Sequence, residues 1–216
     1  MIVLVRHGQT AANAQGRLQG RTDLSLSDVG RAQAQGVARH LVQQYLRLPA
    51  FDPAGIGARR IRIVTSPLPR AVQTAAAIAS GFGVDVAIEP RLIELDYGEW
   101  EGRPLGEVSS DDWARWRNDP EFAPPGGESL VAVRARVDAW LGDVTQTSEP
   151  AAEVLIAVSH VSPIKAAICA ALGSDDTASW RLHLDVASIS RLERRGSGFV
   201  VCSFNETPAA ADGVAH

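Results

Sequence analysis

Short runs of β-branched and apolar residues alternate along this chain with stretches whose apolar residues recur at helical spacing. The alternation predicts a mainly parallel sheet, because parallel strands need a long crossover between them and that crossover is usually a helix. We therefore expect an α/β fold, a three-layer α/β/α sandwich with a small inserted lid. Six strands are expected, at Ile2–Arg6, Ile61–Ser66, Val84–Ile88, Val154–Ser159, Ala187–Leu192 and Phe199–Ser203.

Four helices are expected between these strands, each from a start signal, a stop signal or an apolar stripe of helical period. Ser27 is a good N-cap for the first helix, and Pro69 suits the first turn of the second helix. The helices are expected at Ser27–Gln44, Pro69–Gly81, Ser129–Val144 and in the residues that follow Pro163.

Two stretches carry no strand pattern. Leu48–Arg60 contains two prolines and two glycines, which is typical of a surface loop. Residues 97–127 are rich in tryptophan and end in Pro-Pro-Gly-Gly, and we expect them to form the inserted lid. The length of 216 residues suits one domain over residues 1–206, followed by a flexible tail at residues 207–216.

The charge balance limits the partners that this chain can have. A net charge of −4 leaves no basic surplus for a nucleic-acid backbone, so we expect no nucleic-acid partner. No apolar run approaches the roughly 20 residues of a transmembrane helix, and the first strand lacks the features of a signal peptide. We expect a soluble cytoplasmic enzyme with no membrane partner, for which a homodimer stays open. Cys169 and Cys202 are expected to be buried thiols, because neither has metal-ligand spacing.

The first candidates for chemistry lie where strands are expected to end. Arg6-His7-Gly8 follows the first strand directly, and ligands of open α/β sheets bind beyond the carboxyl ends of strands. Chance is an alternative explanation for a tripeptide alone. Arg70 lies in the first turn of a predicted helix, where a cation opposes the helix dipole. This placement indicates that an anion belongs there, with a solvated surface arginine as the alternative.

Two further candidates complete the set. His160 ends a predicted buried strand, which is the same topological place as that of His7. Glu94 lies between two apolar residues, and burial there would disfavour its charged form, which makes it a candidate proton donor. On composition alone, three nearby carboxylates compete with Glu94 for this role: Asp96, Glu99 and Glu101.

The four segments around these residues, in this order and at these spacings, resemble the histidine phosphatase superfamily, which includes phosphoglycerate mutases and alpha-ribazole phosphatase. The resemblance runs from about Ile2 to Leu192. Many relatives have a glycine pair after the second histidine, where this chain has Val161-Ser162. The segment that begins there looks most similar to the phosphatase domain that is fused behind ribonuclease H in some actinobacterial proteins.

The resemblance implies a role for each matching residue. His7 matches the nucleophile of the family, and Glu94 matches the general acid and base. The residues that match phosphate-binding positions, besides His7 itself, are Arg6, Arg70, His160, Asn13, Gln19 and Gly20.

Elementary chemistry explains why these groups suit phosphoryl transfer, which needs positioning and stabilisation of charge on the phosphoryl oxygens. Arg6 and Arg70 can hold those oxygens bidentately without a metal ion, and His160 adds a third donor if it is protonated. His7 must be neutral to attack phosphorus, and the two arginines favour that form. We therefore expect no metal and no cofactor, with zinc bound by the two histidines as the alternative.

The sequence thus predicts a metal-independent phosphatase that hydrolyses phosphate monoesters of small metabolites through a phosphohistidine. Two alternatives stay open. A mutase of the phosphoglycerate mutase type would pass the phosphoryl group to a second hydroxyl instead of water, although such mutases are usually longer between Glu94 and His160. A catalytically silent relative would only bind phosphorylated ligands.

Two minor features also have open interpretations. Trp113 and Trp116 are three residues apart, so they either pack together within the lid or form an aromatic wall for the organic part of the substrate. His183 is a further candidate for the rim of the site.

Overall fold

A computed structural model describes residues 1–46, 61–146, 154–196 and 198–208. The expected loop at Leu48–Arg60 and all but the first two residues of the expected tail lie outside these ranges. Six strands form one sheet in the order β3-β2-β4-β1-β5-β6. Their bounds are β1 Ile2–Arg6, β2 Ile61–Thr65, β3 Val86–Ile88, β4 Val154–Ser159, β5 Ile189–Arg195 and β6 Gly198–Glu206.

The sheet is mainly parallel, as the alternating pattern predicted. The four strands β3, β2, β4 and β1 are parallel to one another, whereas β5 runs antiparallel to β1, and β6 runs antiparallel to β5. The expected start of the fifth strand at Ala187 is wrong by two residues. Ala187 has a φ of +57°, a left-handed conformation that an extended strand cannot include.

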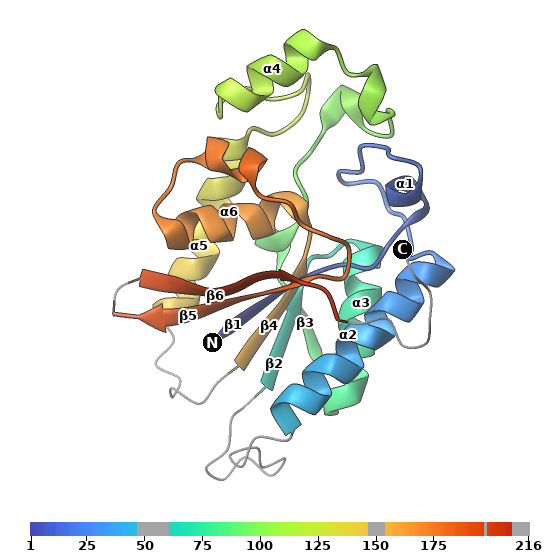
Figure 1. Ribbon diagram of the computed structural model, residues 1–216, viewed down its shortest axis with the longest axis vertical. Helices are drawn as coiled ribbons and strands as arrows, with labels where there is room; N and C mark the ends of the chain where they lie inside the picture. The colour runs from blue at the N-terminus through green and yellow to red at the C-terminus, as the bar shows by residue number, and fades with distance from the viewer. Residues whose placement is uncertain (47–60, 147–153, 197, 209–216) are drawn as a thin grey trace.

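Helices cover both faces of the sheet and complete the three layers, as Figure 1 shows. The helices α2 (Asp28–Leu46) and α3 (Pro69–Phe82) pack against one face, and α5 (Leu130–Gln146) and α6 (Val161–Leu172) pack against the other. The expected start of the fourth helix after Pro163 is wrong, because α6 begins two residues before that proline. Proline is tolerated within the first turn of a helix, where its missing N–H has no partner in the helix.

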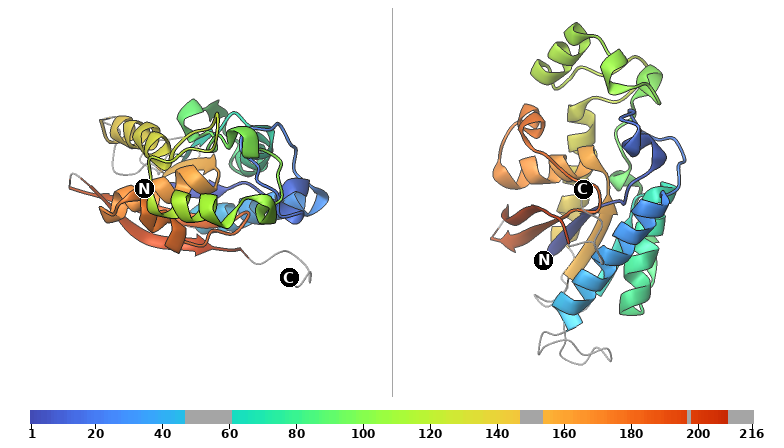
Figure 2. Two further views of the ribbon diagram at one scale, coloured as in Figure 1. Left: turned by 90° about the horizontal axis from the view of Figure 1, so that it is seen from above. Right: turned by 45° about the vertical axis from the view of Figure 1, so that its right-hand side comes forward.

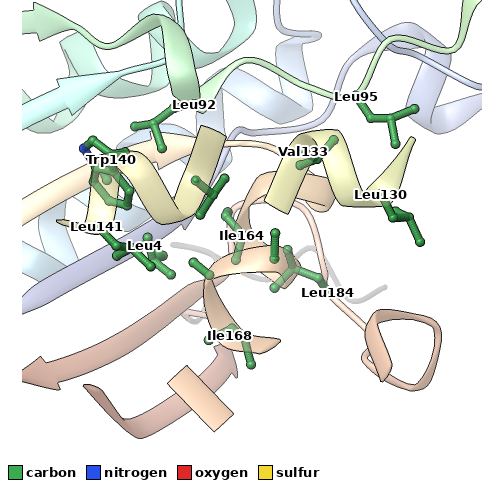
Figure 3. Close-up of a cluster of buried hydrophobic side chains, with 14 of the residues drawn as sticks. Leu4, Leu92, Leu95, Leu130, Val133, Trp140, Leu141, Ile164, Ile168 and Leu184 are labelled. Atoms are coloured by element: carbon green, nitrogen blue, oxygen red, sulfur yellow. The ribbon is translucent and has the colours of Figure 1, made fainter. Parts of the chain in front are cut away.

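The side chains of the central strands alternate between two apolar clusters. Ile2 and Leu4 of β1 join the cluster that α5 and α6 cover, part of which Figure 3 shows. Val3 and Val5 join the cluster under α2 and α3. Because both faces are covered, β1 is a continuous apolar run rather than an alternating one. Its rigid, buried position fixes the residues that follow it.

The tryptophan-rich segment at residues 97–127 contains two short 3-10 turns and the helix α4, Ser110–Asn118. Figure 1 and the right-hand view of Figure 2 show α4 at one end of the molecule, apart from the sheet. We did not expect a helix there, although the hydroxyl of Ser109 caps it by accepting from the N–H of Asp112 at 3.1 Å. Trp113 and Trp116 stack with 5.5 Å between ring centroids, which supports the packing interpretation. The role of this segment as a lid stays a prediction.

The two cysteines differ in exposure. Cys169 is buried in α6, as expected, but Cys202 is exposed on the edge strand β6. The expectation of a second buried thiol is wrong, because alternate residues of an edge strand face solvent. Among the helices within the described ranges, none has the length and apolar character needed to cross a membrane.

Candidate active site

Neighbouring parallel strands bring the two candidate histidines to the same edge of the sheet. Arg6 at the end of β1 pairs with Ser159 at the end of β4. His7 directly follows Arg6, and His160 directly follows Ser159. Their imidazole rings are neighbours, with 5.0 Å between centroids, and both side chains are buried. The strand register therefore explains why two histidines far apart in the sequence lie side by side.

Two hydrogen bonds hold the His7 ring in one orientation and one tautomer. Its Nδ1 lies 2.7 Å from the backbone oxygen of Gly8, which can only accept, so Nδ1 carries the proton. Its Nε2 lies 3.2 Å from Nε of Arg70, which can only donate, so Nε2 presents a lone pair. Both contacts thus assign the same neutral imidazole, with Nε2 as the nucleophilic atom.

The electrostatic surroundings also favour a neutral His7. Burial lowers the pKa of His7 well below its usual value of 6.5, and the positive charges of Arg6 and Arg70 lower this pKa further. The hydrogen bond to the Gly8 carbonyl acts in the opposite direction but is the smallest of these effects. These surroundings therefore favour the unprotonated form of His7.

Arg70 is fully buried in the first turn of α3, so the alternative of a solvated surface arginine is wrong. Its Nη2 donates to the backbone oxygen of Gly20 at 2.6 Å, and its Nη1 donates to that of Thr22 at 3.0 Å. Burial lowers the pKa of Arg70 below its usual value, but an arginine stays charged in proteins. A fixed positive charge consequently lies next to the Nε2 atom of His7.

Arg6 contributes a second guanidinium at the end of β1. It is partly buried, and its Nη1 donates to the backbone oxygen of Leu184 at 2.6 Å. Within the described ranges, three buried nitrogen atoms of the candidate residues have no hydrogen-bond partner: Nε of Arg6, Nε2 of Gln19 and Nδ1 of His160. Buried donors normally have partners, and an oxyanion is the kind of ligand that supplies several acceptors at once.

His160 is held by a hydroxyl that the sequence analysis did not single out. Its Nε2 lies 2.7 Å from Oγ of Ser66, which itself accepts from the N–H of Leu68 at 3.3 Å. Burial lowers the pKa of His160 well below 6.5, and the neighbouring His7, Arg70 and Arg6 lower it further. A protonated ring would add a third donor, but these surroundings favour a neutral ring, which still donates from one nitrogen.

Glu94 is buried and oriented by three backbone N–H groups. Its Oε1 accepts from Leu95 at 2.8 Å and from Ser162 at 3.1 Å, and its Oε2 accepts from Val161 at 3.1 Å. Val161 and Ser162 are the first two residues of α6, directly after His160. These contacts place the carboxylate against the residues that follow the second histidine.

The three carboxylates that compete with Glu94 have other surroundings. Asp96 accepts from the N–H of Gly98 at 2.9 Å and forms an ion pair with Arg21 at 3.2 Å. Glu99 is exposed. Among these acidic residues, Glu94 is therefore the one that is buried and that contacts the residues next to His160.

Glu101 has a structural role that sequence reasoning missed, because it was weighed only as a proton donor. Its carboxylate accepts from the backbone N–H groups of Gly20 at 3.0 Å, Arg21 at 3.2 Å and Thr22 at 2.7 Å. The carbonyl groups of Gly20 and Thr22 in turn accept from Arg70. Glu101 thus fixes the loop at residues 20–22, and this loop orients the Arg70 guanidinium.

Gly20 is required by this arrangement. A Cβ atom at this position would lie 2.5 Å from Oε2 of Glu101 and 2.8 Å from the backbone oxygen of Leu95. The family resemblance implies that Gly20 touches the phosphate or its ester, and this stays a prediction. In the structure Gly20 is the point where the loop approaches Glu101 and Arg70.

Asn13 and Gln19 are joined through Thr10, the N-cap of the short helix α1 (Ala11–Ala14). The Thr10 hydroxyl lies 3.0 Å from Oδ1 of Asn13 and 2.6 Å from Oε1 of Gln19. The helix was not expected, because four residues give too short a pattern to detect. The capping box of Thr10 and Asn13 is the signal that could have found it.

Other residues also contribute to the site or lie away from it. The Thr74 hydroxyl accepts from the N–H of Gly8 at 3.2 Å and donates to the backbone oxygen of Arg70 at 2.8 Å, which ties α3 to the loop after β1. His183, the candidate for the rim, is exposed and contacts Asp185 at 3.0 Å. In the part of the chain that the structure describes, no group of three or more His, Cys, Asp or Glu residues is arranged to hold a metal ion.

The chain is similar to a known family along nearly its whole length. The model of the histidine phosphatase superfamily (branch 1) matches residues 2–207. A bifunctional protein of Mycobacterium tuberculosis is 36% identical over 91% of this chain but over only 51% of its own length. The chain therefore spans about half the length of this relative. The expected likeness to a domain fused to ribonuclease H stays a prediction.

Other relatives match along most of their length. Phosphoserine phosphatase 1 of Hydrogenobacter thermophilus is 34% identical over 95% of this chain and 92% of its own. A probable phosphoglycerate mutase of Cronobacter sakazakii is 36% identical over 93% and 90%. A phosphoserine phosphatase mutant from Entamoeba histolytica, solved in complex with phosphoserine, has a TM-score of 0.80 and 28% identity over 95% and 96% of the two chains.

Proposed function

The chain belongs to the histidine phosphatase superfamily, and from this we propose that it hydrolyses phosphate monoesters through a phosphohistidine on His7. The observation that carries the proposal is the fixed tautomer of His7, whose Nδ1 donates to Gly8 while Nε2 presents its lone pair beside Arg70. A neutral, oriented imidazole next to two guanidiniums suits attack on a phosphorus atom that carries negative oxygens.

The first half-reaction forms a bond between Nε2 of His7 and phosphorus and breaks the bond between phosphorus and the ester oxygen. Arg6, Arg70 and the free nitrogen of His160 supply donors to the phosphoryl oxygens, and they neutralise charge without a metal ion. Glu94 gives a proton to the leaving oxygen, which departs as an alcohol. The product stays on the enzyme as phosphohistidine.

The second half-reaction returns the enzyme to its starting state. Glu94 takes a proton from water, whose oxygen attacks phosphorus while the bond to Nε2 breaks. Inorganic phosphate leaves, and His7 is again the neutral tautomer. Covalent catalysis of this kind replaces one difficult displacement by two easier ones.

The substrate that we propose is a phosphate monoester of a small metabolite, not a nucleic acid. Relatives named as phosphoserine phosphatases support this class. A relative named as a probable phosphoglycerate mutase keeps the mutase reaction as the alternative, in which a second hydroxyl replaces water. A cytoplasmic location is our expectation for such an enzyme.

A rapid-quench experiment tests the proposal. The chain is mixed with p-nitrophenyl phosphate, quenched in alkali and digested, and the peptide that contains His7 is analysed by mass spectrometry. We expect phosphorylated His7 and release of inorganic phosphate, with neither in the His7→Ala variant. Full activity of His7→Ala would refute the mechanism. Transfer of the phosphoryl group to 3-phosphoglycerate with little phosphate release would instead indicate a mutase, and binding without turnover would indicate a silent relative.

A further inference from the structure

A cavity of about 60 Å³ lies between α6 and the tryptophan-rich segment. Val161 and Ser162 line it, and the backbone N–H groups of the same two residues hold the Glu94 carboxylate. The cavity and the Glu94 carboxylate therefore contact the same two residues at the start of α6. The other lining residues that matter here are Lys165, Trp116, Trp180 and Asp176.

Lys165 is a cation with no counter-ion of its own. It lies one turn after Val161 on α6 and is half-buried, and among the described residues its ammonium group has no hydrogen bond or ion pair. Asp176, the acidic residue in the cavity wall, already forms an ion pair with Arg134 at 3.1 Å. Burial lowers the pKa of Lys165 and the charge of Arg6 lowers it further, whereas Glu94 raises it. An unpaired ammonium group in such surroundings favours a bound anion.

Two tryptophans whose indole N–H atoms are buried line the same cavity. Trp116 comes from α4 and is 2% exposed, and Trp180 comes from the segment after α6. Their rings form an edge-to-face pair with 4.9 Å between centroids. Within the described ranges, neither indole N–H has an acceptor. Two side chains that line the cavity thus carry an N–H donor without an acceptor, which suits an oxygen-bearing ligand.

We propose that this cavity is a subsite for a carboxylate on the organic part of the substrate, with Lys165 as the residue that recognises it. The inference rests on the proposed function, since the phosphate must bind at His7. A cationic tail would be repelled by Lys165 and Arg6. A purely apolar tail would leave the ammonium group and the two indole N–H groups without acceptors. The substrate class is consequently phosphate monoesters that carry a carboxylate.

The test compares two substrates that differ only in this group. 3-Phosphoglycerate carries a carboxylate where glycerol 3-phosphate carries a hydroxymethyl group, so the ratio of their kcat/KM values measures recognition of the carboxylate. We expect the wild-type ratio to exceed about 10, because hydrogen bonds to charged groups contribute on the order of a 10–100-fold effect. Lys165→Met should bring the ratio close to one, mainly through KM, and Lys165→Arg should retain most of it.

The control variant is Arg39→Met, which removes an equal charge from the exposed face of α2. It should leave the ratio at the wild-type value. A wild-type ratio near one, or an unchanged ratio in Lys165→Met, would overturn the inference. Circular dichroism and thermal unfolding identify a misfolded Lys165→Met, in which case the smaller change Lys165→Gln takes its place. Failure of the wild type to release phosphate from p-nitrophenyl phosphate would instead refute the proposed function.

Discussion

Two buried neutral histidines should make the stability of this protein depend on pH. Burial lowers the pKa of both His7 and His160 in the folded chain, whereas in the unfolded chain each titrates near 6.5. Below that pH the unfolded state binds more protons than the folded state. The free energy of unfolding must therefore fall as pH decreases through 6.5, and it recovers as pH rises above this value.

The size of the effect follows from linkage. If a histidine stays neutral in the folded state, protonation of the unfolded state at about pH 5.5 costs about 1.4 kcal/mol of stability relative to about pH 8. Both rings are buried, so His7 and His160 together should contribute about 2.8 kcal/mol. This is a large part of the roughly 5–15 kcal/mol by which domains are stable.

Urea unfolding at the two pH values measures this difference. The double variant His7→Gln, His160→Gln has no titrating group at either position, so its loss of stability on acidification should be about 2.8 kcal/mol smaller than that of the wild type. Each single variant should show about half of the reduction. An equal loss in the wild type and the double variant would mean that the rings are protonated in the folded state, and our view of a neutral nucleophile would be wrong.

Three further predictions concern activity. Glu94→Gln should slow the burst of product release on the order of 10²–10⁴-fold for alkyl phosphates but much less for p-nitrophenyl phosphate, whose leaving group needs little protonation; equal burst losses would remove Glu94 as the acid. Activity should survive exhaustive EDTA treatment because Arg6 and Arg70 neutralise the phosphate, and vanadate should inhibit; a loss restored by zinc or magnesium would refute this. Glu101→Gln should raise KM and lower kcat/KM about 10-fold, because loss of a charged hydrogen-bond acceptor misplaces the loop that orients Arg70; unchanged kinetics would show that this loop holds its position without the carboxylate.

The sequence predicted most accurately the elements whose residues all have the same kind of surroundings, such as a strand that is buried on both faces. The strand β1 matched its expected bounds, because a strand buried on both faces reads as an unbroken apolar run. The helix α4 was not expected, since its charged sequence gives little apolar periodicity and its tryptophans pack against Trp180 from a distant segment. Local patterns carry no information about such partners.

In the candidate site, too, some features could be predicted from the sequence and others could not. The positions of His7 and His160 follow from strand ends and were evident from sequence. The contact of Ser66 with His160 and that of Glu101 with the loop at residues 20–22 join segments far apart in the chain. Neither side chain differs in type or spacing from an ordinary surface residue, so only the folded structure reveals these contacts.

The place of Glu101 restricts how the tryptophan-rich segment can be exchanged. In a designed chimaera with a related enzyme, the tryptophan-rich segment is a natural part to replace, because it helps to line the cavity beside α6. Here the first residues of that region also supply the acceptor for three N–H groups of the loop that orients Arg70. A graft should therefore begin after Glu101, or carry a carboxylate at that position, if the transplanted enzyme is to keep its phosphate chemistry.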